Sequence, residues 1–82
     1  MVFFTKHATE KFKVLKRHKF GISKRKVLDT VDSPDLVDSS RLPLLIAQKK
    51  IDRSHVLRVV YKHESGNIKV ITFYPGRVKQ YL

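Results

Sequence analysis

The stretch that decides the fold is His-Val-Leu-Arg-Val-Val-Tyr at residues 55–61, followed after a polar break by Ile-Lys-Val-Ile-Thr-Phe-Tyr at residues 68–74. Both runs are rich in β-branched and aromatic residues, which favour strands. The break, residues 63–67, contains Gly66 and Asn67, and both tolerate positive φ. The pattern therefore predicts an antiparallel β-hairpin.

Side-chain alternation predicts which residues of the hairpin face a core. If Lys62 pairs with Ile68, one face carries apolar side chains, namely Leu57, Val59, Ile71 and Phe73. Arg58 and Lys62 then lie on the opposite face beside Thr72 and Tyr74. Tyr74-Pro75-Gly76 predicts a turn after the hairpin. An extended tail beyond that turn would place Arg77, Lys79 and Tyr81 on one side.

The first half of the chain reads mainly as helix. Residues 2–4 suit a short strand, and residues 6–19 suit a helix with Ala8, Phe12 and Leu15 on one apolar stripe. Ser23 can cap a second short helix that ends before Pro34. Residues 29–40 suggest a fraying helix end and a loop, and residues 44–51 suggest a strand. We therefore expect one α+β domain over residues 1–82, with two N-terminal helices packed on one face of a three- to four-stranded antiparallel sheet.

Composition excludes several classes of protein. The chain has no cysteine, which rules out a cysteine nucleophile and cysteine-rich zinc sites. No apolar run approaches the roughly 18 residues of a membrane span, and the first residues have too short an apolar run for a signal peptide. The expectation is a soluble cytoplasmic protein.

The net charge of +11 is unevenly distributed along the chain. Residues 1–26 and 41–82 are strongly basic, whereas residues 27–40 contain four Asp and no Lys or Arg. Such an excess repels itself unless a polyanion offsets it, so the composition favours a nucleic-acid partner. A Lys-rich thermophilic surface is the alternative, and the scarcity of Asn and Gln also favours a thermophilic source.

Arg58 is the candidate phosphate ligand because it interrupts an apolar strand. A guanidinium can grip phosphate with two parallel hydrogen bonds, although an ordinary solvent-facing strand arginine has the same sequence pattern. Arg77, Lys79 and Tyr81 add two cations and a phenol that can move a proton. A frayed basic tail with Tyr81 as an anchor is the alternative for these three.

The basic residues of the first helix form a second candidate surface. Lys13, Lys16 and Arg17 lie off its apolar stripe and can follow a phosphate backbone, with Lys62 and Lys79 as further nucleic-acid ligands. His7, near the start of that helix, can act as an acid or base near neutral pH. The histidine and aspartate spacings match no zinc or calcium site, so no metal or other cofactor is expected.

Several of these motifs resemble a known superfamily. Arg58-Val-Val-Tyr61, Ile68-Lys-Val-Ile, and Arg77 followed four residues later by Tyr81 resemble the C-terminal half of small RelE-like toxins. His7-Ala8 before an amphipathic helix, and Ile22-Ser23 before a second helix, are similar to the related BrnT-type and short uncharacterised domains. The superfamily's catalytic groups vary among its members, and some members have no known activity.

This resemblance implies a RelE-like α+β fold and metal-independent RNA cleavage on the sheet face away from the helices. The ribose 2′-hydroxyl attacks the adjacent phosphate in that chemistry, and basic side chains stabilise the developing charge. Carried onto this chain, Arg58 and Arg77 would stabilise phosphate, Tyr81 would be the acid or base, and His7 and Lys79 would assist. The implied partners are RNA, including ribosome-bound mRNA, and an acidic antitoxin protein. A non-catalytic nucleic-acid-binding protein and a small protein-interaction module are the alternatives.

Overall fold

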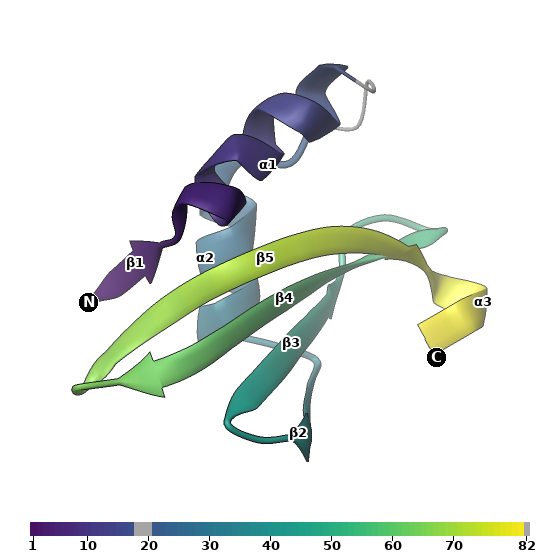
Figure 1. The fold of residues 1–82 in the computed structure, drawn as a ribbon. Helices are drawn as coiled ribbons and strands as arrows, with labels where there is room; N and C mark the ends of the chain where they lie inside the picture. Colours follow the sequence, from purple (N-terminus) through teal and green to yellow (C-terminus); the bar gives the residue numbers. More distant parts are fainter. Residues whose placement is uncertain (18–20, 82) are drawn as a thin grey trace.

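The computed structural model describes residues 1–17 and 21–81. Its strands form one mixed sheet in the order β1-β5-β4-β3-β2, so that β4 is central (Figure 1). Helices α1 and α2 cover one face of this sheet, and the short helix α3 lies at the end of β5. In chain order the elements are β1 (Val2–Phe4), α1 (Lys6–Arg17), α2 (Lys24–Asp32), β2 (Leu36–Arg41), β3 (Leu44–Lys50), β4 (His55–Glu64), β5 (Asn67–Arg77) and α3 (Val78–Tyr81).

The predicted hairpin is confirmed as β4 and β5, but its register differs from the expected one. Ser65 and Gly66 have φ of 51° and 78° and form a two-residue turn, so Ile68 pairs with His63 and not with Lys62. A bulge that leaves Ile71 without a partner shifts the register by one more residue. The total shift is two residues, and a shift of two leaves side chains on the same face.

The apolar face of the hairpin is confirmed with one correction. Leu57, Val59 and Phe73 are fully buried against the helices. Val70 replaces the expected Ile71 in this core, because the bulge turns Ile71 out of the alternation. The predicted helix stripe meets this face, since the Phe12 ring lies 4.6 Å from that of Phe73. Because Leu57 and Val59 point into this core, Arg58 between them points to the opposite face of the sheet.

The α+β class and the two N-terminal helices are confirmed, but the expected three- to four-stranded antiparallel sheet is wrong. The sheet has five strands and is mixed, because β1 pairs in parallel with residues 68–70 of β5. Helix α1 begins at Lys6, only two residues after Phe4, and turns the chain onto one face of the sheet, so β1 ends at Phe4. The start of α1 is as predicted, and the chain is helical through Arg17. The last two residues of the predicted helix, 18 and 19, lie outside the described residues.

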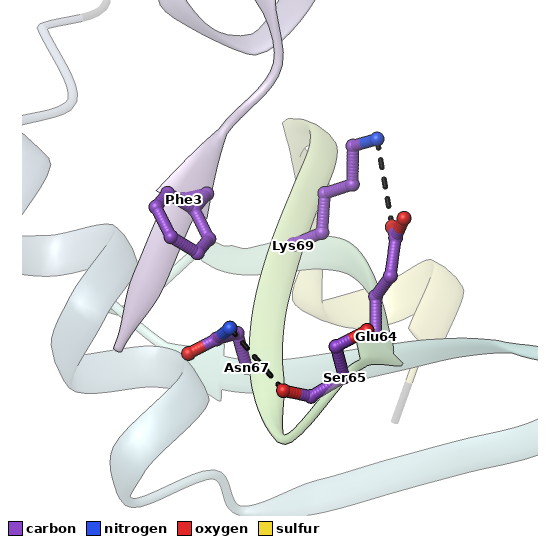
Figure 2. A pocket seen from close by; sticks show the side chains of 5 residues that line it. All are labelled: Phe3, Glu64, Ser65, Asn67 and Lys69. Atoms are coloured by element: carbon purple, nitrogen blue, oxygen red, sulfur yellow. Dashed lines mark hydrogen bonds and ion pairs between the residues drawn. The ribbon is translucent and has the colours of Figure 1, made fainter.

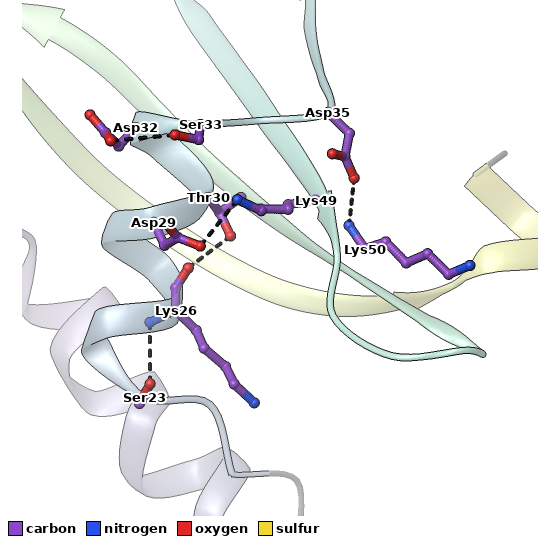
Figure 3. Close-up of polar contacts among 9 residues, drawn as sticks. All are labelled: Ser23, Lys26, Asp29, Thr30, Asp32, Ser33, Asp35, Lys49 and Lys50. Carbon is purple, nitrogen blue, oxygen red and sulfur yellow. Dashed lines mark hydrogen bonds and ion pairs between the residues drawn. The ribbon is translucent and has the colours of Figure 1, made fainter.

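Part of the Asp/Ser-rich segment forms strand β2, whereas the sequence suggests a loop there. Ser23 caps α2 as predicted, and Ser33 ends it. The chain then pairs antiparallel with β3 as β2. Two aspartates hold this corner, since Asp29 forms an ion pair with Lys49 (3.1 Å) and Asp35 accepts a hydrogen bond from the backbone N–H of Lys50 (2.9 Å; Figure 3). Pairing with β3 outweighs the low strand propensity of Asp and Ser.

The C-terminal segment differs from its prediction in two ways. Tyr74-Pro75-Gly76 is part of β5 and not a turn. Pro75 is tolerated there because β1 borders β5 only at residues 68–70, so Pro75 lies on an open edge where no N–H is needed. The tail forms α3 and is not extended, so Arg77, Lys79 and Tyr81 do not share one side.

Thr5 connects α1 to the sheet and carries a stability prediction. Its hydroxyl oxygen accepts a hydrogen bond from the N–H of Ala8 (3.1 Å) and donates one to the carbonyl of Ile71 (2.9 Å). We expect Thr5→Ala to lower the free energy of unfolding by about 1–2 kcal/mol, measured by urea denaturation. Thr5→Ser keeps both hydrogen bonds and is the matched control, and equal losses in the two variants would contradict the capping role.

No helix within residues 1–17 and 21–81 is long and apolar enough to cross a membrane.

Candidate functional site

Arg58 lies at the centre of a polar cluster on the sheet face opposite α1 and α2. Its Nε donates a hydrogen bond to the Tyr74 hydroxyl (3.0 Å), and its Nη1 donates one to Oε1 of Gln48. Its Nη2 lies 4.0 Å from a carboxylate oxygen of Asp38, and its guanidinium carbon lies 4.2 Å from the Tyr81 ring centroid. We call these five residues the Arg58 cluster.

Strand register positions the cluster. Gln48 of β3, Arg58 of β4 and Tyr74 of β5 are direct cross-strand partners, so their side chains stand side by side. Asp38 of β2 lies one strand further out, two residues along from the partner of Gln48. The side chains of four adjacent strands, β2 to β5, therefore lie close together on one face of the sheet.

The fifth member, Tyr81, comes from the tail. Its backbone carbonyl accepts a hydrogen bond from Nε2 of Gln48 (3.3 Å), and its ring covers the guanidinium. Stacking an aromatic ring on a guanidinium is favourable, particularly where water is excluded. Tyr81 thereby shields Arg58 from solvent, and Arg58 is only 8% exposed.

These contacts change the interpretation of Arg58. Each of its side-chain nitrogens faces a partner within the protein, and no buried polar side-chain atom of the described residues lacks one. A guanidinium held in this way stabilises the sheet face, and a phosphate would have to compete with these internal partners for it. Arg58 therefore lies on the face opposite the helices, as predicted, but it is buried there and not open to solvent.

Gly76 makes room for Tyr81, which gives a second prediction. A methyl group at residue 76 would fall inside van der Waals contact of the Tyr81 ring. We expect Gly76→Ala to displace that ring and to lower the free energy of unfolding by about 1–3 kcal/mol in urea titrations. The double variant Gly76→Ala/Tyr81→Ala removes the clash, so the alanine at residue 76 should cost much less in the Tyr81→Ala background. An undiminished cost in that background would contradict the proposed contact.

The other expected catalytic residues are not in the cluster. Arg77 is exposed at the end of β5 opposite His55, where it lines a separate pocket with Lys79. His7 is exposed in the first turn of α1, on the helix-covered side of the sheet. The structure therefore brings Arg58 and Tyr81 together and leaves Arg77 and His7 elsewhere.

The expected nucleic-acid ligands of α1 are accessible. Lys13, Lys16 and Arg17 are exposed, and Lys13 and Arg17 are four residues apart on the side of the helix away from buried Ala8. Among the residues that the structure describes, none of these cations forms an ion pair with a carboxylate. We call these three residues the α1 basic surface.

Lys62 differs from the α1 basic surface because it has an acidic partner. Its Nζ lies 3.7 Å from Glu64, and Lys69 lies 3.5 Å from the same carboxylate. Figure 2 shows the Lys69–Glu64 pair beside the hairpin turn, in a pocket whose wall includes Phe3. Lys62 is thus partly neutralised, although it does lie on the face opposite the helices, as predicted.

Metal ligands are not grouped in the described part of the chain, where no three His, Asp or Glu side chains lie together. Comparisons of the chain with protein-family models, with curated proteins and with solved structures found no match. Inference about function therefore depends on the residues and their geometry.

Three residues of the Arg58 cluster were not predicted from the sequence as site residues: Gln48, Asp38 and Tyr74. Gln48 is 1% exposed, although in the sequence it ends an apolar run and is followed by Lys49 and Lys50. That position is typical of an exposed residue, so the sequence does not indicate that Gln48 and Arg58 form a buried pair. Asp38 is one of four aspartates that recur every three residues from residue 29 to residue 38, and that spacing does not distinguish it from the other three.

Proposed function

We propose that the protein binds RNA through the α1 basic surface. The observation that carries this proposal is the set of exposed cations on α1, which form no ion pair within residues 1–17 and 21–81, in a chain with a net charge of +11. Like charges close together on one helix destabilise the free protein, and a phosphate backbone relieves that repulsion while releasing its own counterions. Contacts of this kind position the chain on RNA without reading its base sequence.

The test is binding of a fluorescent single-stranded RNA, measured by anisotropy at 50 and 200 mM salt. Tight binding at low salt that weakens steeply at the higher concentration supports the proposal. Absence of binding at 50 mM salt overturns it and leaves the protein-interaction module as the remaining class.

RNA cleavage of the RelE-like type is the second candidate, and the Tyr81–Arg58 contact favours it. Two helices on one face of a sheet, with an arginine and a tyrosine meeting on the other, suit a RelE-like fold. In this reaction the 2′-hydroxyl would attack the adjacent phosphate and lose its proton to solvent, while the bond from phosphorus to the 5′-oxygen of the next nucleotide breaks and leaves a 2′,3′-cyclic phosphate. Arg58 would stabilise the charge that develops on the phosphate, and Tyr81 would donate its proton to the leaving 5′-oxygen. Arg58 would first have to exchange an internal partner for phosphate, which is why binding is the leading proposal.

Cleavage is tested by incubating free RNA with the protein in EDTA and, in a separate assay, translating ribosomes with the protein in a buffer that contains their Mg²⁺. If the cleavage candidate holds, Tyr81→Phe should lower the rate by about 100-fold or more, because it removes the proton-transferring hydroxyl. The phenylalanine ring can still cover Arg58, so a fall in rate would not reflect loss of that packing. Intact RNA with wild-type protein excludes this candidate without affecting the binding proposal. An acidic antitoxin partner is proposed only together with cleavage.

A further inference from the structure

A second cationic site lies at the junction of α3 and the loop before β4. Five residues line an open pocket of about 490 Å³ there: Arg53, Ser54, Arg77, Val78 and Lys79. Three of them are cations, and no carboxylate is among them. Arg53 has no part in the Arg58 cluster or the α1 basic surface.

The backbone around this pocket is held in place from both sides. The N–H of Val78 donates to the carbonyl of Ser54 (2.8 Å), and Arg77 pairs with His55 across the β4–β5 ladder. The loop carrying Arg53 is therefore tied to the segment carrying Arg77 and Lys79. Because these two backbone segments are already tied together, less conformational entropy is lost when Arg53, Arg77 and Lys79 contact one ligand.

The nearest acidic side chain in sequence, Asp52, is directed to other partners. Its carboxylate accepts hydrogen bonds from the N–H groups of Ser54 and His55 (2.8 Å each) and lies 3.0 Å from Nδ1 of His55. The Ser54 N–H stabilises the ionised form and lowers the pKa of Asp52 below its usual value. Among the described residues, Arg53, Arg77 and Lys79 form no ion pair with this or any other carboxylate.

We infer that this pocket binds a terminal phosphate group, as carried by a phosphorylated end of RNA. Two guanidinium groups can each donate two hydrogen bonds, and an ammonium and a hydroxyl add further donors. A phosphate monoester carries up to two negative charges, against one for a backbone diester, and so complements three cations better. The naming of RNA as the carrier rests on the proposed function, whereas the affinity for phosphate does not.

The first experiment tests the pocket with inorganic phosphate. In ¹H–¹⁵N spectra of the whole protein, saturable shifts are expected at the amides of Ser54 and Val78 and at the Nε–H groups of Arg53 and Arg77. Arg53→Gln should abolish saturation at these positions, whereas Arg41→Gln, which removes an exposed cation from β2, should leave it unchanged. Shifts that do not saturate, or that are equal in the two variants, overturn the site.

The second experiment compares RNA oligonucleotides of one sequence with 5′-phosphate, 3′-phosphate or hydroxyl ends. One phosphorylated end should bind roughly tenfold more tightly than the hydroxyl-ended RNA, as expected for charge-assisted hydrogen bonds, and Arg53→Gln should remove that preference. Equal affinity for all three overturns the terminal assignment, and an equal loss for all three in Arg53→Gln assigns the pocket to a backbone diester. Saturable phosphate binding without RNA binding would refute the proposed function and leave the site in place.

Discussion

Arg58→Ala is expected to lower the free energy of unfolding by about 3 kcal/mol. The substitution leaves the side chain of buried Gln48 without its donor and Tyr74 without its partner, and it removes the cation beneath the Tyr81 ring. Removing one member of a buried hydrogen-bonded charged group commonly costs 3–5 kcal/mol, and the long 4.0 Å contact with Asp38 places this case near the lower end, at about 3. Urea denaturation followed by circular dichroism measures the loss.

Arg41→Ala is the matched control, because Arg41 is an exposed arginine on the neighbouring strand β2. Its cost should stay within about 0.5 kcal/mol. A cost below about 1 kcal/mol for Arg58→Ala would show that the internal contacts of Arg58 contribute little, and would restore it as an available phosphate ligand. The same result bears on activity assays, since loss of function in Arg58→Ala can follow from lost stability.

Neutralising the α1 basic surface is expected to have the largest effect on RNA binding. The variant Lys13→Gln/Lys16→Gln/Arg17→Gln removes three cations that have no acidic partner among the described residues. Each phosphate contact to a single strand contributes roughly 0.7 to the slope of log affinity against log salt, so three contacts contribute about 2. We expect the slope to become shallower by about that amount and the affinity at 50 mM salt to fall at least roughly tenfold.

A control variant with the same net charge tests whether RNA binding depends on the α1 basic surface or on the overall positive charge of the protein. Lys50→Gln/Lys62→Gln/Lys69→Gln also removes three charges, but Lys62 and Lys69 already face Glu64. This control should change the salt slope much less than the α1 variant. Equal effects would mean that RNA responds to overall charge and not to α1, and the proposed binding surface would then be wrong.

Elements with strong local patterns were predictable. The Ala8–Phe12 stripe specifies α1, and the Ser23 cap specifies the start of α2, because both signals arise within one or two helical turns. The hairpin strands were predicted from their β-branched runs. The predicted register was wrong by one residue at the turn and by one more at the bulge, and a total shift of two residues leaves Leu57, Val59 and Phe73 on the predicted core face. Local signals were insufficient where pairing with a distant strand decides the conformation.

The missed features show this dependence on pairing. Residues 36–41 have the composition of a loop, yet they form β2 because β3 offers a pairing edge. Pro75 suggests a turn, yet it lies in a strand because β1 is too short to reach it. The length of β1 and the available edge of β3 depend on parts of the sequence far from Pro75 and from residues 36–41, so local sequence patterns could not predict these two features.

The sequence by itself determined the charge, the two N-terminal helices, the central hairpin and the presence of an arginine on the non-core face. Only the tertiary structure decided what that arginine does. Gln48, Tyr74 and Tyr81 come from three other segments, and they meet Arg58 because strand register and the direction of α3 place them there. Accessibility of a charged group depends on such distant neighbours, so the same physics that buries Arg58 leaves the cations of α1 exposed to a partner.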